Sequence, residues 1–129
     1  MEDNAADVFL IRAAIQTAEI VADVHVVRDG EQAVKFFEQA DSDITAPCPA
    51  LVILDINLPK KTGGEVLEQM RRSGRCCSAL VIAVSTSESP HDRENMMRLG
   101  AHSYFHKPSE YQNFMKLGDV VKDLLSRRK

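Results

Sequence analysis

The 129-residue sequence has no apolar run of the ~18 residues that a membrane-spanning helix needs, and no signal-peptide pattern. It also lacks an excess of positive charge, since its net charge is −3. The first absence argues against a membrane partner, and the second gives no electrostatic reason to expect nucleic acid. We therefore expect a soluble cytoplasmic protein that binds neither.

Cysteine is scarce: there are three, and two of them, Cys76 and Cys77, are adjacent. An odd number without a CxxC pair or suitably spaced histidines argues against a disulfide framework and against a zinc site. We expect all three cysteines to be reduced thiols.

Apolar segments with helical and strand periodicity alternate along the chain, which is long enough for one domain. Continuous apolar strands between amphipathic helices predict a doubly wound parallel α/β sheet covered on both faces. The expected strands are 24–27, 51–55, 79–85 and 103–106. Helices are expected over 5–20, after Asp29-Gly30, after Thr62, from Ser89-Pro90 to Leu99, and after Ser109.

Four of these helices begin with capping signals. The pairs are Asp29 with Gln32, Thr62 with Glu65, Ser89 with Pro90, and Ser109 with Gln112. The chain begins with a helix, however, so a regular alternation lacks its first strand. Glu2 and Asp3 stand where that strand should end.

Polar residues follow the expected strands at their carboxyl ends, where open parallel sheets bind ligands. Carboxylates gathered there must take up protons or a cation, and Mg²⁺ prefers oxygen ligands and retains water. Such a site around one nucleophilic carboxylate suits phosphoryl transfer. The residues are Glu2, Asp3, Asp55, Ser85, Thr86 and Lys107.

Four stretches resemble the receiver domains of two-component response regulators, which have a flavodoxin-like fold. The resemblance is strongest to small single-domain regulators that partner phytochrome-type histidine kinases. It includes the spacings of 30 positions from Asp55 to Ser85 and 22 from Ser85 to Lys107. The stretches are "EDN" (2–4), "LVILDINLPKKTGGEVL" (51–67), "VIAVSTS" (81–87) and "GAHSYFHKP" (100–108).

The resemblance implies a role for each matching residue. Asp55 would be the phosphoacceptor, and Lys107 and Ser85 would contact the phosphoryl group. Mg²⁺ would be held by Glu2, Asp3, Asp55 and the backbone carbonyl of Asn57.

Ser85, Thr86 and Tyr104 would form the switch that alters the 85–126 surface, and thereby contacts with a downstream protein or a second copy. A cis bond before Pro108 would aim Lys107 into the site. The whole chain, 1–129, would be one receiver domain without an output domain, and no enzyme apart from self-phosphorylation and slow autodephosphorylation.

The missing first strand departs from the family, in which it is an inner strand. Its loss would leave a gap of roughly 9–10 Å, about two strand spacings. Three explanations stand: a longer natural polypeptide, which we favour; a shift of 24–27 to pair with 51–55; or association of two chains. If residue 1 is the terminus, the Met1 α-ammonium would compete with Mg²⁺.

Two other functions place different demands on these residues. A degenerate receiver that serves as a scaffold without phosphorylation is the main alternative, because of the missing strand. A phosphatase with an aspartate nucleophile would need a second acid two residues after Asp55, where this chain has Asn57.

Overall fold

The computed structural model describes residues 1–2, 4–22, 24–43, 45, 48–56, 62–74, 76, 78–87 and 89–127. At its centre is a parallel sheet in the order β1-β2-β3. Its strands are β1 (Leu51–Asp55), β2 (Leu80–Ser85) and β3 (Ser103–His106). Leu51 lies opposite Leu80, and Ile82 lies opposite Ser103.

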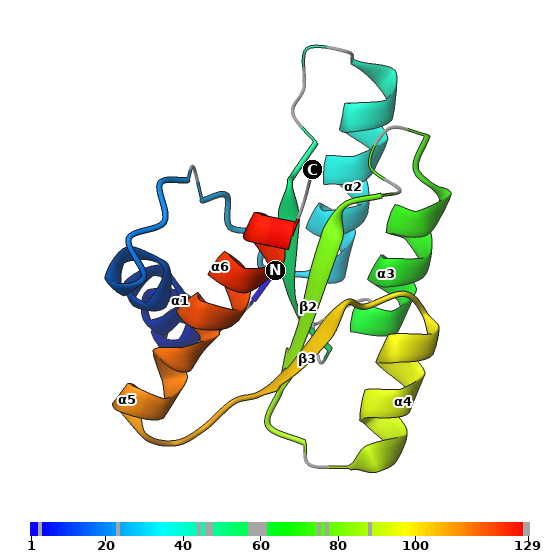
Figure 1. Ribbon diagram of the computed structural model, residues 1–129. Coiled ribbons are helices and arrows are strands. Elements are labelled where there is room, and N and C mark those ends of the chain that lie inside the picture. The colour runs from blue at the N-terminus through cyan, green and yellow to red at the C-terminus, as the bar shows by residue number, and fades with distance from the viewer. Residues whose placement is uncertain are drawn as a thin grey trace.

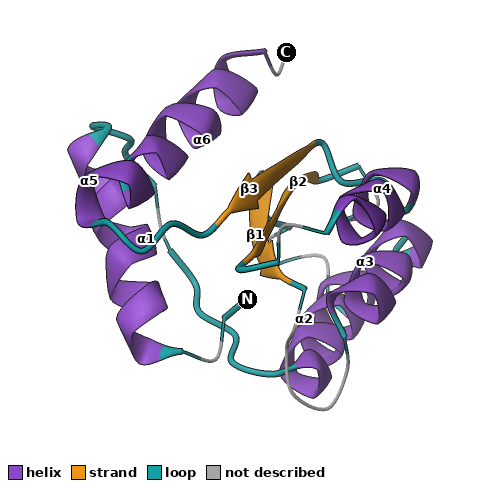
Figure 2. Ribbon diagram, turned by 90° about the horizontal axis from the view of Figure 1, so that it is seen from below, coloured by secondary structure: helices purple, strands orange, loops and turns teal. Residues whose placement is uncertain are grey.

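Helices cover both faces of this sheet (Figures 1 and 2). One layer consists of α1 (Ala5–Thr17), α5 (Tyr111–Phe114) and α6 (Lys116–Arg127). The other consists of α2 (Gly30–Ser42), α3 (Gly63–Arg72) and α4 (Pro90–Arg98). The predicted doubly wound α/β class is therefore confirmed. No helix in the described ranges is long and apolar enough to cross a membrane.

The central strand shows why the sheet needs two layers. Side chains of β2 alternate between two cores: Val81 and Ala83 pack in the core that contains α2 and α3 residues. Ile82 and Val84 pack in the core with α1 and α6 residues. All four are at most 1% exposed, so the apolar run 81–84 is what a strand buried on both faces requires.

Two of the predicted helix caps are present. Asp29 Oδ1 accepts a hydrogen bond from the Gln32 N–H at 2.9 Å, and Thr62 Oγ1 accepts one from the Glu65 N–H at 3.2 Å. The third lies where it was predicted, with Ser89 at the N-cap position and Pro90 at the start of α4, although Ser89 makes no side-chain capping hydrogen bond. The fourth is wrong, because Glu110 rather than Ser109 precedes the next helix. That final helix is also divided at Met115, because a short turn, α5, leads into α6.

The expected strand over 24–27 is wrong, because the structure has no strand in this segment. It does not pair with β1 either, so the hypothesis that it shifts onto 51–55 is also wrong. Instead, Met1 and Glu2 lie between the two. The Met1 amino group donates to Ile53 O at 2.7 Å, the Asp55 N–H donates to Met1 O at 3.0 Å, and the Glu2 N–H donates to Val27 O at 2.9 Å. Two residues offer too little backbone to order a neighbouring strand.

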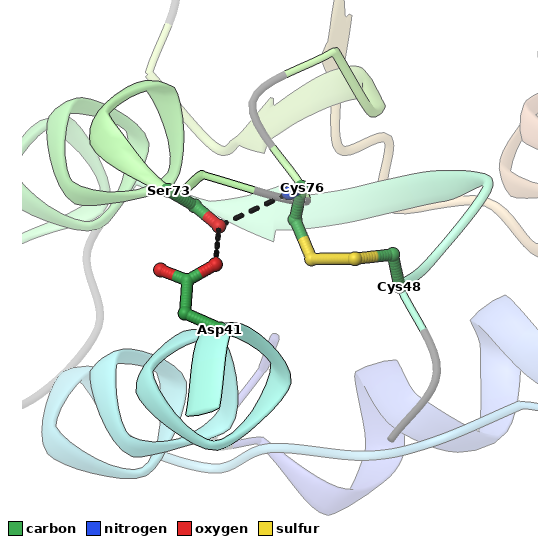
Figure 3. Close-up of a disulfide and its surroundings, with 4 residues drawn as sticks. All are labelled: Asp41, Cys48, Ser73 and Cys76. Atoms are coloured by element: carbon green, nitrogen blue, oxygen red, sulfur yellow. Dashed lines mark hydrogen bonds between the residues drawn. A yellow bond between two sulfur atoms is a disulfide. The ribbon is translucent and has the colours of Figure 1, made fainter. Parts of the chain in front are cut away.

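The expectation of three reduced thiols is wrong as well, because Cys48 and Cys76 form a disulfide (Figure 3). The two residues are 28 positions apart, but their Cα atoms are 5.4 Å apart, within the range that a disulfide spans. Ser73 supports this corner: its hydroxyl donates to Asp41 at 2.7 Å and accepts from the Cys76 N–H at 3.0 Å. Cys77 lies outside the described residues.

Candidate functional site

Asp55 ends β1 and is fixed by backbone hydrogen bonds on both sides. Its own N–H donates to Met1 O, and the next N–H, of Ile56, donates to Val84 O at 3.2 Å. Its side chain is only 9% exposed. The start of α3 packs closely against the end of β1, since a Cβ at Gly63 would lie 2.5 Å from Ile56 Cα. Glycine is therefore required at position 63, and this close packing together with the backbone hydrogen bonds fixes the position of Asp55.

Lys107 follows β3 and reaches the same point. Its N–H donates to Ser85 O at 2.7 Å, which continues the pairing of β3 with β2 by one residue. The bond to Pro108 is trans, since no cis bond occurs in the described chain; the predicted cis bond is wrong. Backbone pairing with Ser85 aims the lysine instead.

The ammonium of Lys107 contacts three carboxylates. The distances from Nζ are 2.7 Å to Glu2 Oε2, 2.9 Å to Asp7 Oδ2 and 3.0 Å to Asp55 Oδ2. Burial alone would lower the pKa of Lys107, but the hydrogen bonds to these carboxylates outweigh it and raise the pKa above its ordinary value. The lysine therefore stays charged, and among the described residues three carboxylates contact this one ammonium.

The pKa of Glu2 is changed by its position in this site. It is 2% exposed, and burial raises its pKa to about 7, with a further rise from Asp55 and an opposing effect of Lys107. The Met1 amino group is also affected, since burial lowers its pKa to about 6. Burial of charged groups is thus the main cause of both shifts.

Carboxylate oxygens gathered at this end of the sheet fit a hard divalent cation, which binds such oxygens. Of the predicted ligands, the structure brings Glu2 and Asp55 together on the same ammonium. Asp3 and Asn57 lie outside the described residues. Within the described ranges no group of three His, Cys, Asp or Glu side chains is arranged to hold an ion. The oxygen donors of Glu2 and Asp55 therefore fit Mg²⁺.

The predicted switch residues lie around the start of the loop that follows β2. Ser85 is 1% exposed, and its Oγ accepts from the Ser87 N–H at 3.0 Å. The half-buried Tyr104 donates its hydroxyl hydrogen to Ser87 O at 3.1 Å. The exposed Thr86 has its carbonyl 3.0 Å from His106 Nε2. In this structure Tyr104 and His106, both on β3, therefore hold the loop that begins at Ser85.

Asp7 was missed by sequence reasoning. It lies in the first turn of α1, and Asn4 caps that helix by accepting from the N–H groups of Ala6 and Asp7. A signal was available: α1 starts three residues after Glu2, so an acid in its first turn lies near the carboxyl end of the sheet. Acids at that position are common for capping reasons alone, which hid its contact with Lys107.

Residues 1–118 match the family model of the response regulator receiver domain. The chain belongs to this family. It is 30% identical over 117 residues to "Response regulator Rcp1" of Synechocystis sp., covering 91% of this chain and 80% of that protein.

Solved structures agree. The chain superposes on the phosphorylated cyanobacterial phytochrome response regulator RcpA with a TM-score of 0.87 at 30% identity, covering 100% of this chain and 93% of that one. For the Mn²⁺-bound form of response regulator Rcp1 the TM-score is 0.83 at 28% identity, covering 97% and 90%. The resemblance to phytochrome-associated regulators is thus confirmed, and the chain is a receiver domain of two-component phosphorelay signalling.

Proposed function

We propose that this receiver domain accepts a phosphoryl group on Asp55 from a histidine kinase in the presence of Mg²⁺. The observation that carries the proposal is the contact of Lys107 Nζ with Asp55 Oδ2 at 3.0 Å, at a buried strand end that also gathers Glu2 and Asp7. A rigid carboxylate beside one fixed cation suits phosphoryl transfer, which depends mainly on positioning and electrostatics.

In the proposed step a carboxylate oxygen of Asp55 attacks the phosphorus of a phosphohistidine. An oxygen–phosphorus bond forms and the nitrogen–phosphorus bond breaks, and the histidine nitrogen keeps the electron pair. Lys107 would stabilise charge on the phosphoryl oxygens. Bound Mg²⁺, held by Glu2, Asp3, Asp55 and the Asn57 carbonyl, would neutralise phosphoryl charge.

Phosphorylation would then act on the loop after β2. A phosphoryl group on Asp55 offers acceptor oxygens to the Ser85 hydroxyl, whose oxygen now accepts from the Ser87 N–H. Redirecting that hydroxyl would loosen the hold of Tyr104 on Ser87 O and change the 85–126 surface with Thr86. The readout would be altered contact with a downstream protein or with a second copy.

The partner proposal rests on relatives. RcpA is a phytochrome response regulator, and another similar structure, 32% identical with a TM-score of 0.76, is a bacteriophytochrome response regulator. We propose a phytochrome-type sensor kinase in the cytoplasm as the donor, and loss of the phosphoryl group by slow autodephosphorylation.

The test is intact-mass measurement after incubation with a small acyl phosphate and Mg²⁺. We expect a gain of about 80 Da that disappears in Asp55→Asn and persists in Asp119→Asn, which removes an exposed acid on α6. No gain in the unaltered chain would favour the alternative, a scaffold that is not phosphorylated.

A further inference from the structure

The Cys48–Cys76 disulfide joins two segments of the chain that meet at one corner of the molecule (Figure 3). Cys48 lies three residues before β1, and Cys76 lies between α3 and β2. Both pack in the core that contains α2 and α3 residues. The two cysteines are covered to different degrees, however, because Cys48 is half-buried whereas Cys76 is only 1% exposed.

Cys76 is held in the interior by its own backbone. Its N–H donates to the Ser73 hydroxyl oxygen at 3.0 Å, and its carbonyl accepts from the Ala79 N–H at 3.2 Å. Ser73 is itself buried, and its hydroxyl donates to Asp41 Oδ1 on α2 at 2.7 Å. The turn after α3 is therefore tied to α2, and Cys76 cannot move outward without breaking these hydrogen bonds.

This difference in burial decides how the disulfide reacts with another thiol. A thiolate breaks a disulfide by attacking one of its two sulfur atoms, and the rate depends on access to that atom. In the folded chain the half-buried Cys48 is open to such an approach, whereas Cys76 is covered by the core. The fold therefore directs the attack to Cys48.

We infer that Cys48 and Cys76 form a reversible thiol–disulfide exchange site for a low-molecular-weight thiol of the glutathione type, and that the sulfur of Cys48 is the atom attacked. The inference goes beyond the proposed function, because it concerns a second covalent modification. Its place in the fold is separate from the candidate site, since Cys48 precedes the start of β1 and Asp55 ends that strand.

The exchange takes place in two steps. In the first, a glutathione thiolate attacks the Cys48 sulfur; a new sulfur–sulfur bond forms, and the Cys76 sulfur leaves with the electron pair and takes up a proton. In the second, another glutathione thiolate attacks the glutathione sulfur of this mixed disulfide and releases Cys48 as a thiol. The protein disulfide is thereby reduced by two electrons, and two glutathione molecules are oxidised to one glutathione disulfide.

The experiment uses the full chain with Cys77→Ser, so that Cys48 and Cys76 are its only cysteines. The oxidised protein is incubated briefly with reduced glutathione, and the reaction is stopped with acid. The thiols that remain are blocked with N-ethylmaleimide, and each cysteine peptide is sequenced by mass spectrometry. A second sample is treated in the same way in urea, where the chain is unfolded and both sulfur atoms are accessible.

In the folded chain we expect glutathione on Cys48 and N-ethylmaleimide on Cys76, in an excess of about tenfold or more over the reverse pattern. In urea the two patterns should agree within about twofold, because burial no longer distinguishes the sulfur atoms. Glutathione disulfide added to the reduced, folded chain should restore the Cys48–Cys76 bond.

Three results would overturn the inference. The first is equal labelling of the two cysteines in the folded chain, or glutathione mainly on Cys76. The second is exchange that takes place only in urea, because the disulfide would then be a permanent structural bond. The third is a reduced, folded chain that glutathione disulfide does not reoxidise.

A pair of serine variants, made in the same Cys77→Ser chain, tests whether the buried turn directs the attack. Ser73→Ala removes the hydrogen bonds to Asp41 and Cys76, so Cys76 becomes easier to reach and the preference for Cys48 should fall by about threefold or more. Ser42→Ala is the matched control, because the Ser42 hydroxyl donates to Gln39 O within α2, and it should keep the full preference. An unchanged preference in a folded Ser73→Ala chain would contradict the role assigned to this turn.

Discussion

The two edges of β1 are built differently. Toward β2 the strand is paired from Leu51 to Asp55. The side chains of Val52 and Leu54 point to the sheet face covered by α2 and α3, and they are at most 6% exposed. On the other edge, within the described residues, only its carboxyl end is paired, by Met1, and Leu51 and Ile53 border an apolar cavity of about 440 Å³. The paired part of this edge lies beside Asp55. The position of Asp55 therefore depends on the last hydrogen bonds of the edge, those made by Met1, rather than on pairing along the whole edge.

The first prediction contrasts neighbouring residues of β1. Leu54→Ala should lower the free energy of unfolding by about 4 kcal/mol, because Leu54 is 1% exposed in packed surroundings. Ile53→Ala should cost only about 1 kcal/mol, because Ile53 already lines a cavity. Urea unfolding of both variants measures the contrast. Equal losses would show that the two sheet faces on which Leu54 and Ile53 lie are packed alike.

The second prediction concerns the Cys48–Cys76 disulfide, which lies near the edge of β1 that faces away from β2. Cys48, which lines the cavity, is joined to Cys76 across 28 positions. Replacing both with serine should lower the free energy of unfolding by about 3 kcal/mol, since the unfolded chain regains its freedom.

Reduction of the unaltered chain with a dithiol provides the matched measurement. It should reproduce the loss seen in the double variant and leave that variant unchanged. A reduced chain as stable as the oxidised one would contradict a stabilising role for the link.

The third prediction tests the carboxylates around Lys107 at the carboxyl end of β1. Asp7→Asn removes one of the three carboxylates on Lys107, at 2.9 Å, and should destabilise the fold by about 1 kcal/mol because Asp7 is part-exposed. Phosphorylation at Asp55 should persist, because Asp55 and Glu2 still hold the ammonium. The comparison is with Asp123→Asn, an exposed acid paired with Arg127, which should change little. A complete loss of phosphorylation in Asp7→Asn would mean that Asp7 belongs to the reacting groups.

The fourth prediction, with the smallest effect, concerns the pH dependence of stability that arises from His102, which contacts β2. His102 Nδ1 accepts from the Val81 N–H at 3.1 Å, and burial together with Arg71 lowers the pKa of His102. The unfolded chain therefore binds a proton more readily. The stability contributed by neutral His102 is present above its ordinary pKa of about 6.5 and is lost as pH falls toward the lower folded value.

Replacing His102 with Gln should make the free energy of unfolding less dependent on pH between about 7.5 and 5.5, as measured by urea unfolding at both limits. Other groups titrate in this range, but they are common to both chains. Identical pH dependence in the two would refute the assignment.

Much of this architecture was predictable from the sequence. The apolar runs at 51–55 and 79–85 and the caps at Asp29 and Thr62 carry local signals, and all are present in the structure. Lys107 and Asp55 meet because parallel strands bring their carboxyl ends to one edge.

The failures have a common physical origin in long-range context. The 24–27 segment has strand-forming residues but lacks a long enough neighbour to pair with. The Cys48–Cys76 link joins two loops whose approach depends on the packing of α2 and α3. Asp7 reaches Lys107 only through the placement of α1.

The most direct measurement locates the phosphoryl group in the unaltered chain. The protein is treated with a small acyl phosphate and Mg²⁺ and digested, and the modified peptide is sequenced by mass spectrometry, with a parallel sample in EDTA. We expect one phosphoryl group, on Asp55, that depends on the metal. A group on another residue, or none at all, would contradict the account.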